Sequence, residues 1–421
     1  MKYKKYKLGD ICKIFGRIGF RGYTTEDLVL SPSDGAISLS PSNIVDGVMD
    51  LSKCTYISWA KYEESPEIKI APNDIVIVKT GNSYGRTAII RNVEHPMTLN
   101  PQFVVLKDIQ INPVYLAYFI KTDEFQKQIY GIVGGSAIPT LSQENLANLI
   151  VRVPNENIQN TIADILDSLD GKIELNKQIN DNLEAMAKQL YDYWFVQFDF
   201  PNEEGKPYKS SGGAMVYNEK MKREIPQGWT AANIFDELSV QYGFPFSTGL
   251  FTEEPTNIPV VRIRDILENS VSAYSREEAD EKYKLQKQDL LIGMDGNFHM
   301  NYWNDNVSYL NQRSVRLRAN PNSTVSILQA RYDIAPYIKA KELRAKGSTV
   351  GHLSDKDLKG LFVLVSPNAD FRNKFDSILA EIIENRCEIE SLTKQRDELL
   401  PLLMNGQATI NYHLSVFYIK R

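Results

Sequence analysis

Cysteine and histidine are scarce in this chain, and they are widely separated. The three cysteines, Cys12, Cys54 and Cys387, are odd in number and lie in no cluster. This distribution argues against a disulfide framework or a zinc cluster and favours a reducing compartment, so we expect the protein in the cytoplasm. The four histidines lie between His95 and His413 and form no pair at helical spacing. We therefore expect no metal site in this chain.

Long apolar runs and a basic excess are also missing. No apolar stretch approaches the roughly 18 residues of a membrane span. The basic start, MKYKKYKLGD, lacks the apolar stretch of a secretory signal. The formal net charge is −5, whereas nucleic-acid-binding proteins usually carry a basic excess. Any DNA site must therefore be a local patch or depend on charge that a partner supplies.

The chain does contain an internal repeat, and its 421 residues are enough for two or more domains. The segment GGSAIPTLSQENLANLIVRVP (134–154) is echoed by KGSTVGHLSDKDLKGLFVLVSP (346–367), with a Leu-Ser pair repeated 212 residues later. Upstream, PNDIVIVKTGN (72–82) is echoed by KQDLLIGMDGN (287–297). Each of these reads as a strand that ends in a Gly-Asn turn. Many short strands and one helix expected at 113–130 predict a mixed α+β module, present twice.

A long helical pattern follows each module. Apolar residues recur at three- and four-residue steps over 162–190 and again over 375–403, which is typical of a heptad seam. Polar residues interrupt both seams, namely Lys172 and Asn176 in the first and Arg386 and Arg396 in the second. Such residues can fix the register and the partner of a helix. Each helix should be about 55–60 Å long at 1.5 Å per residue.

The segment FDFPNEEGKPYKSSGGAM (198–215) separates the two halves. Its Pro, Gly and Ser content is typical of a linker or of an ordered surface loop. Aromatic residues cluster at the end of the first long helix and the start of this segment, and we expect them to pack between helix, linker and module: Tyr191, Tyr193, Trp194, Phe195 and Phe198. The order is thus module, long helix, linker, module, long helix.

This order suits a protein that holds two modules at a fixed separation, as a molecular ruler does. If the helices pair antiparallel, one module lies at each end, with approximate two-fold symmetry. Duplex DNA repeats about every 34 Å, and paired readers commonly match half-sites at such spacing. Differences between the modules would then let the two half-sites differ. The same geometry also suits a purely structural spacer.

The order of elements resembles the specificity (S) subunit of type I restriction–modification systems. The resemblance is carried by YDYWFVQFDFPNEEGKPYKSSGGAMVYNEKMKREIPQGW (191–229), by the two module ends, by LLPLLMNGQ (399–407) and by the paired helices. It spans essentially the whole chain. Two parts depart from it. The first module starts at YKLGDI without a Pro-x-Gly-Trp opening, and the tail ATINYHLSVFYIKR has no assigned role.

The resemblance implies an α+β fold, with two mixed α/β target-recognition domains separated by two long antiparallel coiled-coil helices in a pseudo-two-fold arrangement. The domains would be residues 1–154 (first recognition domain), 155–198 (first spacer helix), 199–217 (linker), 218–367 (second recognition domain), 368–407 (second spacer helix) and 408–421 (C-terminal tail).

The resemblance also implies a function without catalysis. The chain would bind a bipartite double-stranded DNA sequence and dock two modification subunits, which bind S-adenosylmethionine and methylate adenine. Restriction subunits, which use ATP and Mg to translocate DNA, would join them. The chain itself would hold no cofactor and contact no membrane. Two alternatives remain: a structural coiled-coil adaptor, or a stand-alone adenine methyltransferase.

Two motifs that could indicate catalysis have simpler interpretations. NPQF (100–103) is similar to the Asn-Pro-Pro-Tyr/Phe signature of adenine methyltransferases, but its third residue is Gln102 and no Gly-rich loop follows a strand upstream. A turn that enters a strand is favoured there. PNDIVIVK (72–79) has Ile77 where a metal-dependent nuclease needs an acid, so a buried strand is favoured.

Polar residues in the matched loops are candidates for DNA contact. Arg and Asn side chains can bond guanine and adenine respectively, and hydroxyls and Lys suit phosphates. In the first module these candidates are Arg17, Arg21, Tyr23, Thr24, Lys79, Thr80, Asn82, Ser83, Tyr84, Arg86, Ser136 and Thr140. In the second they are Tyr242, Ser247, Thr248, Asp295, Asn297, His299, Asn301, Gln312, Arg313, Lys346, Ser348 and His352.

Overall fold

The computed structural model describes residues 2–17, 22–45, 47–133, 140–345, 351–409 and 418–419. The chain divides into two units, Met1–Lys172 with Leu392–Arg421, and Ile173–Ser391. Each unit holds one module and a part of each long helix, so the helices do not form a third unit. Within the described ranges, the structure contains no helix with the length and apolar character of a membrane span.

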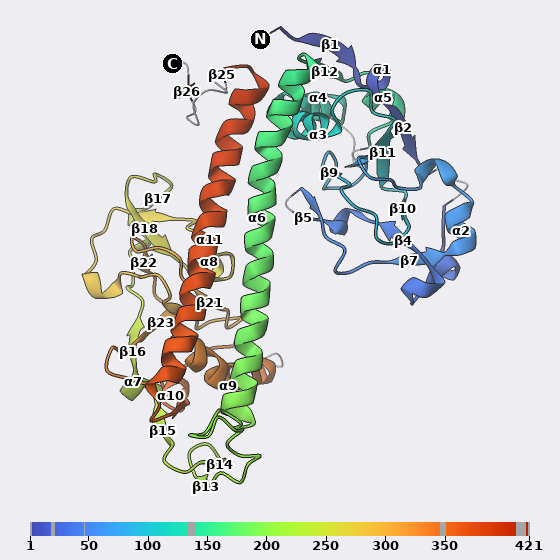
Figure 1. Ribbon diagram of the computed structural model, residues 1–421. Coiled ribbons are helices and arrows are strands. Elements are labelled where there is room, and N and C mark those ends of the chain that lie inside the picture. The colour runs from blue at the N-terminus through green and yellow to red at the C-terminus, as the bar shows by residue number, and fades with distance from the viewer. Residues whose placement is uncertain are drawn as a thin grey trace. The chain divides into compact units, whose positions relative to one another are not determined.

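The first module contains two four-stranded sheets (Figure 1). The antiparallel sheet has the order β2 (Lys13–Gly16), β11 (Phe103–Lys107), β8 (Ile75–Val78) and β9 (Thr87–Ile89). The second sheet has the order β10 (Met97–Leu99), β4 (Gly35–Leu39), β7 (Tyr56–Ser58) and β3 (Leu28–Val29), with β10 parallel to β4. Strand β1 (Lys4–Lys7) pairs with β12 (Ile150–Val153), so the module begins and ends at one point.

The second module repeats the strand order of both four-stranded sheets. Its antiparallel sheet has the order β16 (Leu238–Tyr242), β23 (Ser314–Ala319), β20 (Leu290–Gly293) and β21 (Met300–Tyr302). The other sheet has the order β22 (Tyr309–Leu310), β18 (Ile258–Val261), β19 (Tyr274–Ser275) and β17 (Phe251–Thr252), again with one parallel pair, β18 and β22. Strand β15 (Thr230–Asn233) pairs with β24 (Phe362–Val365). The duplication predicted from the repeat is therefore confirmed.

A buried ion pair occupies the same place in both antiparallel sheets. Asp74 precedes β8 and accepts a hydrogen bond of 2.5 Å from Lys107 at the end of β11. Asp289 precedes β20 and accepts hydrogen bonds of 2.6 and 2.7 Å from Arg318 of β23. Burial raises the pKa of Asp289, and the hydrogen bonds from Arg318 oppose that rise. The two modules thus share this buried ion pair as well as the strand order of their sheets.

The helical segments differ from the prediction in one detail. The helix predicted at 113–130 is divided into α3 (Pro113–Lys121) and α4 (Asp123–Val133). Thr122 lies between them with an extended backbone, at ψ 150°, and its N–H bonds the carbonyl of Phe119. In the second module, one continuous helix, α9 (Ile327–Ala345), follows β23 in the place that α3 and α4 take after β11.

The two long helices are α6 (Glu156–Tyr191) and α11 (Ala369–Met404), which run side by side in opposite directions (Figure 1). Each has 36 residues, or about 54 Å at 1.5 Å per residue. Polar side chains join them: Asn385 donates to Asn180 at 2.9 Å, Asn176 to Glu388 at 2.9 Å, and Arg396 to Asp170 at 2.9 Å. The predicted antiparallel pairing is confirmed, but Lys172 is exposed and does not interrupt the seam.

The Asn180–Asn385 pair predicts a measurable asymmetry. Replacing Asn180 alone with leucine leaves the Asn385 amide buried without its acceptor, and we expect a loss of about 1–3 kcal/mol in the free energy of unfolding. Replacing both with leucine removes both polar groups and should be nearly neutral. Urea unfolding followed by far-ultraviolet circular dichroism measures both variants. Equal losses in the single and double variants would contradict this role for the pair.

Residues of the predicted aromatic cluster pack into the hydrophobic core of the second unit. Phe195 and Phe198 lie against Trp229 with ring centroids 5.2 and 5.8 Å apart. Phe200 stacks on Trp229 at 5.0 Å. The segment that the sequence left open as linker or loop is thus an ordered loop anchored by aromatic rings.

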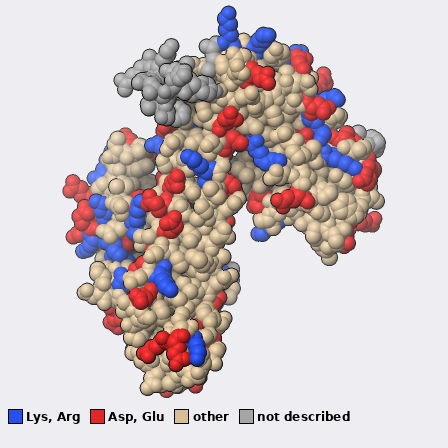
Figure 2. Space-filling view, in the orientation of Figure 1, with Lys and Arg blue, Asp and Glu red and all other residues tan. Residues whose placement is uncertain are grey.

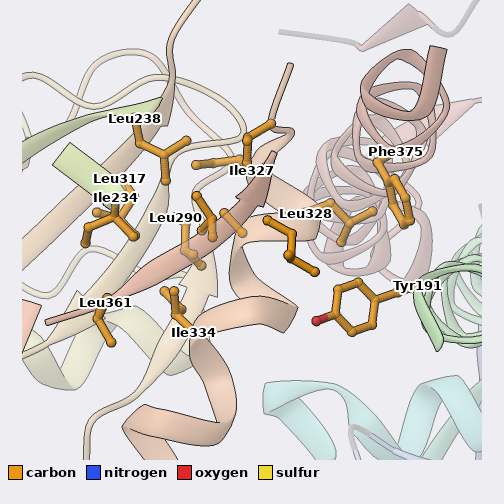
Figure 3. Packing of buried hydrophobic residues seen from close by; sticks show 14 of the residues in the cluster. Tyr191, Ile234, Leu238, Leu290, Leu317, Ile327, Leu328, Ile334, Leu361 and Phe375 are labelled. Atoms are coloured by element: carbon orange, nitrogen blue, oxygen red, sulfur yellow. The ribbon is translucent and has the colours of Figure 1, made fainter. Parts of the chain in front are cut away.

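Helix α6 is also tied to α9 within the second unit. Tyr191 of α6 and Phe375 of α11 face Leu328 of α9 (Figure 3). The Tyr191 hydroxyl donates a hydrogen bond of 2.7 Å to Asp333. Burial raises the pKa of Asp333 to about 6, although this hydrogen bond opposes the rise. The module and its helix therefore share one hydrophobic core.

Candidate nucleic-acid interface

In the first module, three segments meet at a corner where β8 ends. They are the residues after β8, the turn before β11 and the segment before α5 (Gln143–Ala147). The Lys79 N–H donates to the carbonyl of Gln102 at 2.7 Å, and the Leu141 N–H donates to the carbonyl of Lys79 at 2.8 Å. Thr80 pairs with Thr140 across the same corner. The structure thus brings together three predicted candidates, Lys79, Thr80 and Thr140.

The second module has the same corner at the end of β20. The Met294 N–H donates to the carbonyl of Arg313 at 2.9 Å, and the Leu353 N–H donates to the carbonyl of Met294 at 2.7 Å. Asp295 pairs with His352, as Thr80 does with Thr140. Helix α10 (Asp355–Leu358) follows, in the place of α5. Here the predicted candidates Asp295, Arg313 and His352 come together.

The repeated Leu-Ser motif builds these corners. The Ser142 hydroxyl accepts the N–H of Asn145 at 3.0 Å and caps α5, and the Ser354 hydroxyl accepts the N–H of Asp357 at 3.3 Å and caps α10. The leucines of the motif are fully buried: Leu141, Leu146, Leu353 and Leu358. The residues that match between the copies therefore fold the corner, whereas the exposed residues beside them differ.

Charged side chains form a trio at the second corner. Asp295 accepts a hydrogen bond of 2.8 Å from Arg313, and its other carboxylate oxygen lies 2.6 Å from Nδ1 of His352. Burial alone would raise the pKa of Asp295, but the hydrogen bonds from His352 and Arg313 together lower it. The side chains of Arg313 and His352 are 63% and 54% exposed. Asp295 thus holds two exposed side chains that can donate hydrogen bonds.

Sequence reasoning missed one residue at the first corner, Gln102. It occupies the place of Arg313, because its carbonyl accepts from the end of β8 as that of Arg313 does from the end of β20. The Asn100 amide donates to the side-chain oxygen of Gln102 at 3.2 Å, and the Gln102 N–H donates to Asn100 at 2.9 Å. NPQF is therefore the turn before β11 that the sequence predicted. The second module has NQRS (311–314) at the place of NPQF, and this match was the signal that could have identified Gln102.

Some candidates bond within the protein instead. Arg17 is 4% exposed, and its guanidinium donates to the carbonyl of Leu99 at 2.9 Å. The Tyr23 hydroxyl accepts from Ser38 at 3.0 Å, and the Thr24 N–H caps a short turn by donating to Asp27 at 2.7 Å. Asn301 donates to the carbonyl of Leu267 at 2.9 Å and accepts from Arg386 at 3.0 Å. These side chains are therefore held by internal partners.

Tyr84 and Arg86 line a cavity of about 600 Å³ in the first module. Tyr84 meets Tyr130 edge to face at 5.6 Å between ring centroids. Lys121 also lines the cavity, and burial lowers its pKa. The cavity therefore combines aromatic rings with cations.

The remaining candidates are spread over the turns and loops. The Tyr242 hydroxyl donates to Asp355 at 2.5 Å, close to the second corner. The Ser247 N–H donates to Glu277 at 2.6 Å, and Thr248 begins a short 3-10 helix. Four further candidates lie in the turns after β8 and β20 and one before β23: Asn82, Ser83, Asn297, His299 and Gln312. Arg21, Ser136, Lys346 and Ser348 lie outside the described residues.

Basic and acidic side chains are interspersed on the face shown in Figure 2. This mixture agrees with the net charge of −5. Recognition of DNA by this chain would therefore depend on individual side chains more than on a broad attraction to phosphate.

Known proteins resemble both the sequence and the fold. Residues 1–185 match the family described as type I restriction modification DNA specificity domain. The MjaIX specificity subunit of a type I restriction enzyme from Methanocaldococcus jannaschii is 27% identical over 358 residues, which cover 82% of this chain and 79% of that protein. The chain is therefore similar in sequence to type I specificity subunits over most of its length.

Two further comparisons agree with this similarity, one in sequence and one in fold. The EcoBI specificity subunit from Escherichia coli is 26% identical over 193 residues, 44% of this chain and 40% of that protein. The crystal structure of the S subunit from M. genitalium has the same fold, with a TM-score of 0.60, 15% identity and coverage of 96% of both chains. The resemblance inferred from the sequence and the predicted fold class are confirmed.

Proposed function

We propose that this chain reads a bipartite DNA sequence, one half with each module, and performs no chemistry itself. One observation carries the proposal. The modules share the strand order of their four-stranded sheets, a buried ion pair and the corner, yet the polar side chains at the corner differ, with Thr80 and Thr140 in one and Asp295 and His352 in the other. A shared scaffold with different exposed residues suits the reading of two different half-sites.

The complex would contain partner subunits. We propose two modification subunits, which bind S-adenosylmethionine and methylate adenine, and restriction subunits that use ATP and Mg. Leu175 and Met186 on α6 are 56% and 47% exposed, and such apolar side chains can serve as contacts for a partner. The assembly would work in the cytoplasm, and the three free cysteines agree with a reducing compartment.

Selection from a randomised duplex library tests this function. The full chain, together with its modification subunits, is expected to enrich two short motifs at a fixed separation. Specific sites are typically bound about 10³–10⁷ times more tightly than non-specific DNA. A single enriched motif would contradict the reading of two half-sites. If nothing is enriched, the coiled-coil adaptor is the better interpretation.

The stand-alone methyltransferase has a separate test. Titration of the purified chain with S-adenosylmethionine in a calorimeter is expected to give no heat of binding. Saturable binding by the chain alone would favour the methyltransferase instead.

A further inference from the structure

The two corners place different side chains on one backbone position. Gln102 and Arg313 each lie in the turn before a strand, β11 and β23 respectively. The main-chain carbonyl of Gln102 accepts the N–H of Lys79, the residue after β8, at 2.7 Å. The main-chain carbonyl of Arg313 accepts the N–H of Met294, the residue after β20, at 2.9 Å. Both side chains are exposed. Any ligand that meets the two corners in the same way therefore meets an amide in one and a guanidinium in the other.

Each of these side chains is oriented by a neighbour. Asn100, which is 7% exposed, donates to Oε1 of Gln102 at 3.2 Å. Asp295 binds Nη1 of Arg313 at 2.8 Å. A carboxyamide fixed through one lone pair keeps its NH₂ group and a second lone pair for a ligand, and a guanidinium fixed through Nη1 keeps its other N–H donors. Each side chain is thus oriented so that it can form a bidentate hydrogen bond with a ligand.

The charge at Gln102 and Arg313 themselves favours base edges over phosphates. The Asp295 carboxylate lies between Arg313 and His352, and it offsets the positive charge of Arg313 and so weakens its attraction for a phosphate. The Gln102 amide is uncharged and offers a phosphate no ionic attraction. Base edges are neutral and display paired donors and acceptors, which match both side chains.

The backbone supports a special role for Arg313. Its φ is 66°, in the left-handed region that residues other than glycine rarely adopt. Such a conformation persists where the surrounding structure fixes it, and it is often found at functional sites. Here it places the side chain at the corner, next to Asp295.

We infer that Gln102 and Arg313 are the equivalent base-reading residues of the two modules, with Gln102 selecting adenine in one half-site and Arg313 selecting guanine in the other. Glutamine bonds adenine through N6 and N7, and arginine bonds guanine through O6 and N7. Asn100 and Asp295 are positioning residues. The inference rests on the proposed function and adds to it the base that each corner selects.

Reciprocal substitutions test the inference by library selection with the full chain and its modification subunits. Arg313→Gln is expected to reduce the preference for guanine at one position of one half-site by roughly 5- to 150-fold. Gln102→Arg should reduce the preference for adenine by a similar factor at one position of the other half-site. Gln288 has a φ of 73° in the same module, so the chain already holds a glutamine in this conformation.

A matched control separates base reading from loss of charge. Arg276 is 61% exposed and paired with Glu254, much as Arg313 is 63% exposed and paired with Asp295. Arg276→Gln is expected to leave every position of the enriched motif unchanged. Asp295→Ala should weaken the preference at the position that Arg313→Gln affects, and Asp295→Asn, which keeps an oxygen acceptor, should weaken it less.

Two outcomes would overturn the inference while leaving the proposed function intact. In the first, Arg313→Gln weakens binding to all sequences equally and lowers the salt dependence by about one counterion, as a phosphate contact would. In the second, the wild-type protein enriches a bipartite motif that neither substitution alters. If the wild-type protein enriches no motif, the proposed function itself fails.

Discussion

Replacing Arg318 with alanine is expected to destabilise the second module by about 3–5 kcal/mol, because it leaves a buried carboxylate without its cation. Asp289 has a side chain that is 1% exposed, and Arg318 supplies two of its hydrogen bonds. Among the described residues, the one remaining donor to it would be the N–H of Gln286, at 2.7 Å. Hydrogen exchange of the β20 and β23 amides should accelerate by roughly two to four orders of magnitude if they exchange through opening of this module.

The pH dependence gives the prediction a second readout. Burial already raises the pKa of Asp289, and the loss of Arg318 removes an opposing interaction, so the pKa rises further in the folded variant. A carboxyl group whose pKa is higher in the folded than in the unfolded state destabilises the folded protein, and the effect is complete above the folded-state pKa. The effect disappears as the pH falls and the group becomes protonated in both states. The difference between variant and wild type should therefore shrink as the pH falls.

The first module provides the matched control. Lys107→Ala removes the equivalent cation from Asp74, which keeps a hydrogen bond of 2.8 Å from the N–H of Ala71. The Asp74 side chain is 8% exposed, against 1% for Asp289. The loss should accordingly be smaller, and it should be confined to β8 and β11. Unchanged exchange in β20 and β23 of Arg318→Ala would contradict the role of the ion pair.

Lengthening both long helices by seven residues is expected to move the preferred half-site spacing by about three base pairs. Seven residues add about 10.5 Å in two turns and so nearly keep the apolar face in line. The insertions belong between Asp170 and Asn176 in α6 and between Glu388 and Arg396 in α11, where they preserve each polar contact of the helix pair. The prediction rests on the proposal that the helices set the spacing, and library selection measures it.

An insertion into α6 alone is the control for this experiment. It moves one side of the seam past the other, so Asn180 no longer faces Asn385, or Asp170 no longer faces Arg396. Specific binding should then be lost without a new spacing. If the double insertion binds the original spacing as well as the wild-type protein does, the helices do not act as the ruler.

The sequence predicted the features that depend on local pattern. The repeat predicted two copies of one module, and the steps of three and four residues predicted the helix pair. The direction of individual side chains was harder to predict, because it depends on distant partners. Arg17 looked like an exposed candidate, yet its acceptor is the carbonyl of Leu99, 82 residues away. Lys172 matched the seam by spacing, yet it is exposed.

The candidate site was predictable only as a set of loops. The repeat located both corners, but Gln102 was assigned to a turn and no more. Its exposure and its contact with Asn100 emerge only when the turn is folded against β8. The pairing of Asp295 with His352 joins residues 57 apart in the chain, which spacing alone does not predict.

The pairing of β1 with β12, and of β15 with β24, makes each module a closed loop of chain. The chain enters and leaves at neighbouring residues, Lys4 beside Val153 and Thr230 beside Val365. Each strand pair holds the two ends of its module together, and doubling the enclosed length costs only about 0.6 kcal/mol in loop-closure entropy, so modules of different length can be joined at the same pair. Genetic exchange at these two strand pairs could therefore replace a whole module in one event and leave the pair of long helices unchanged.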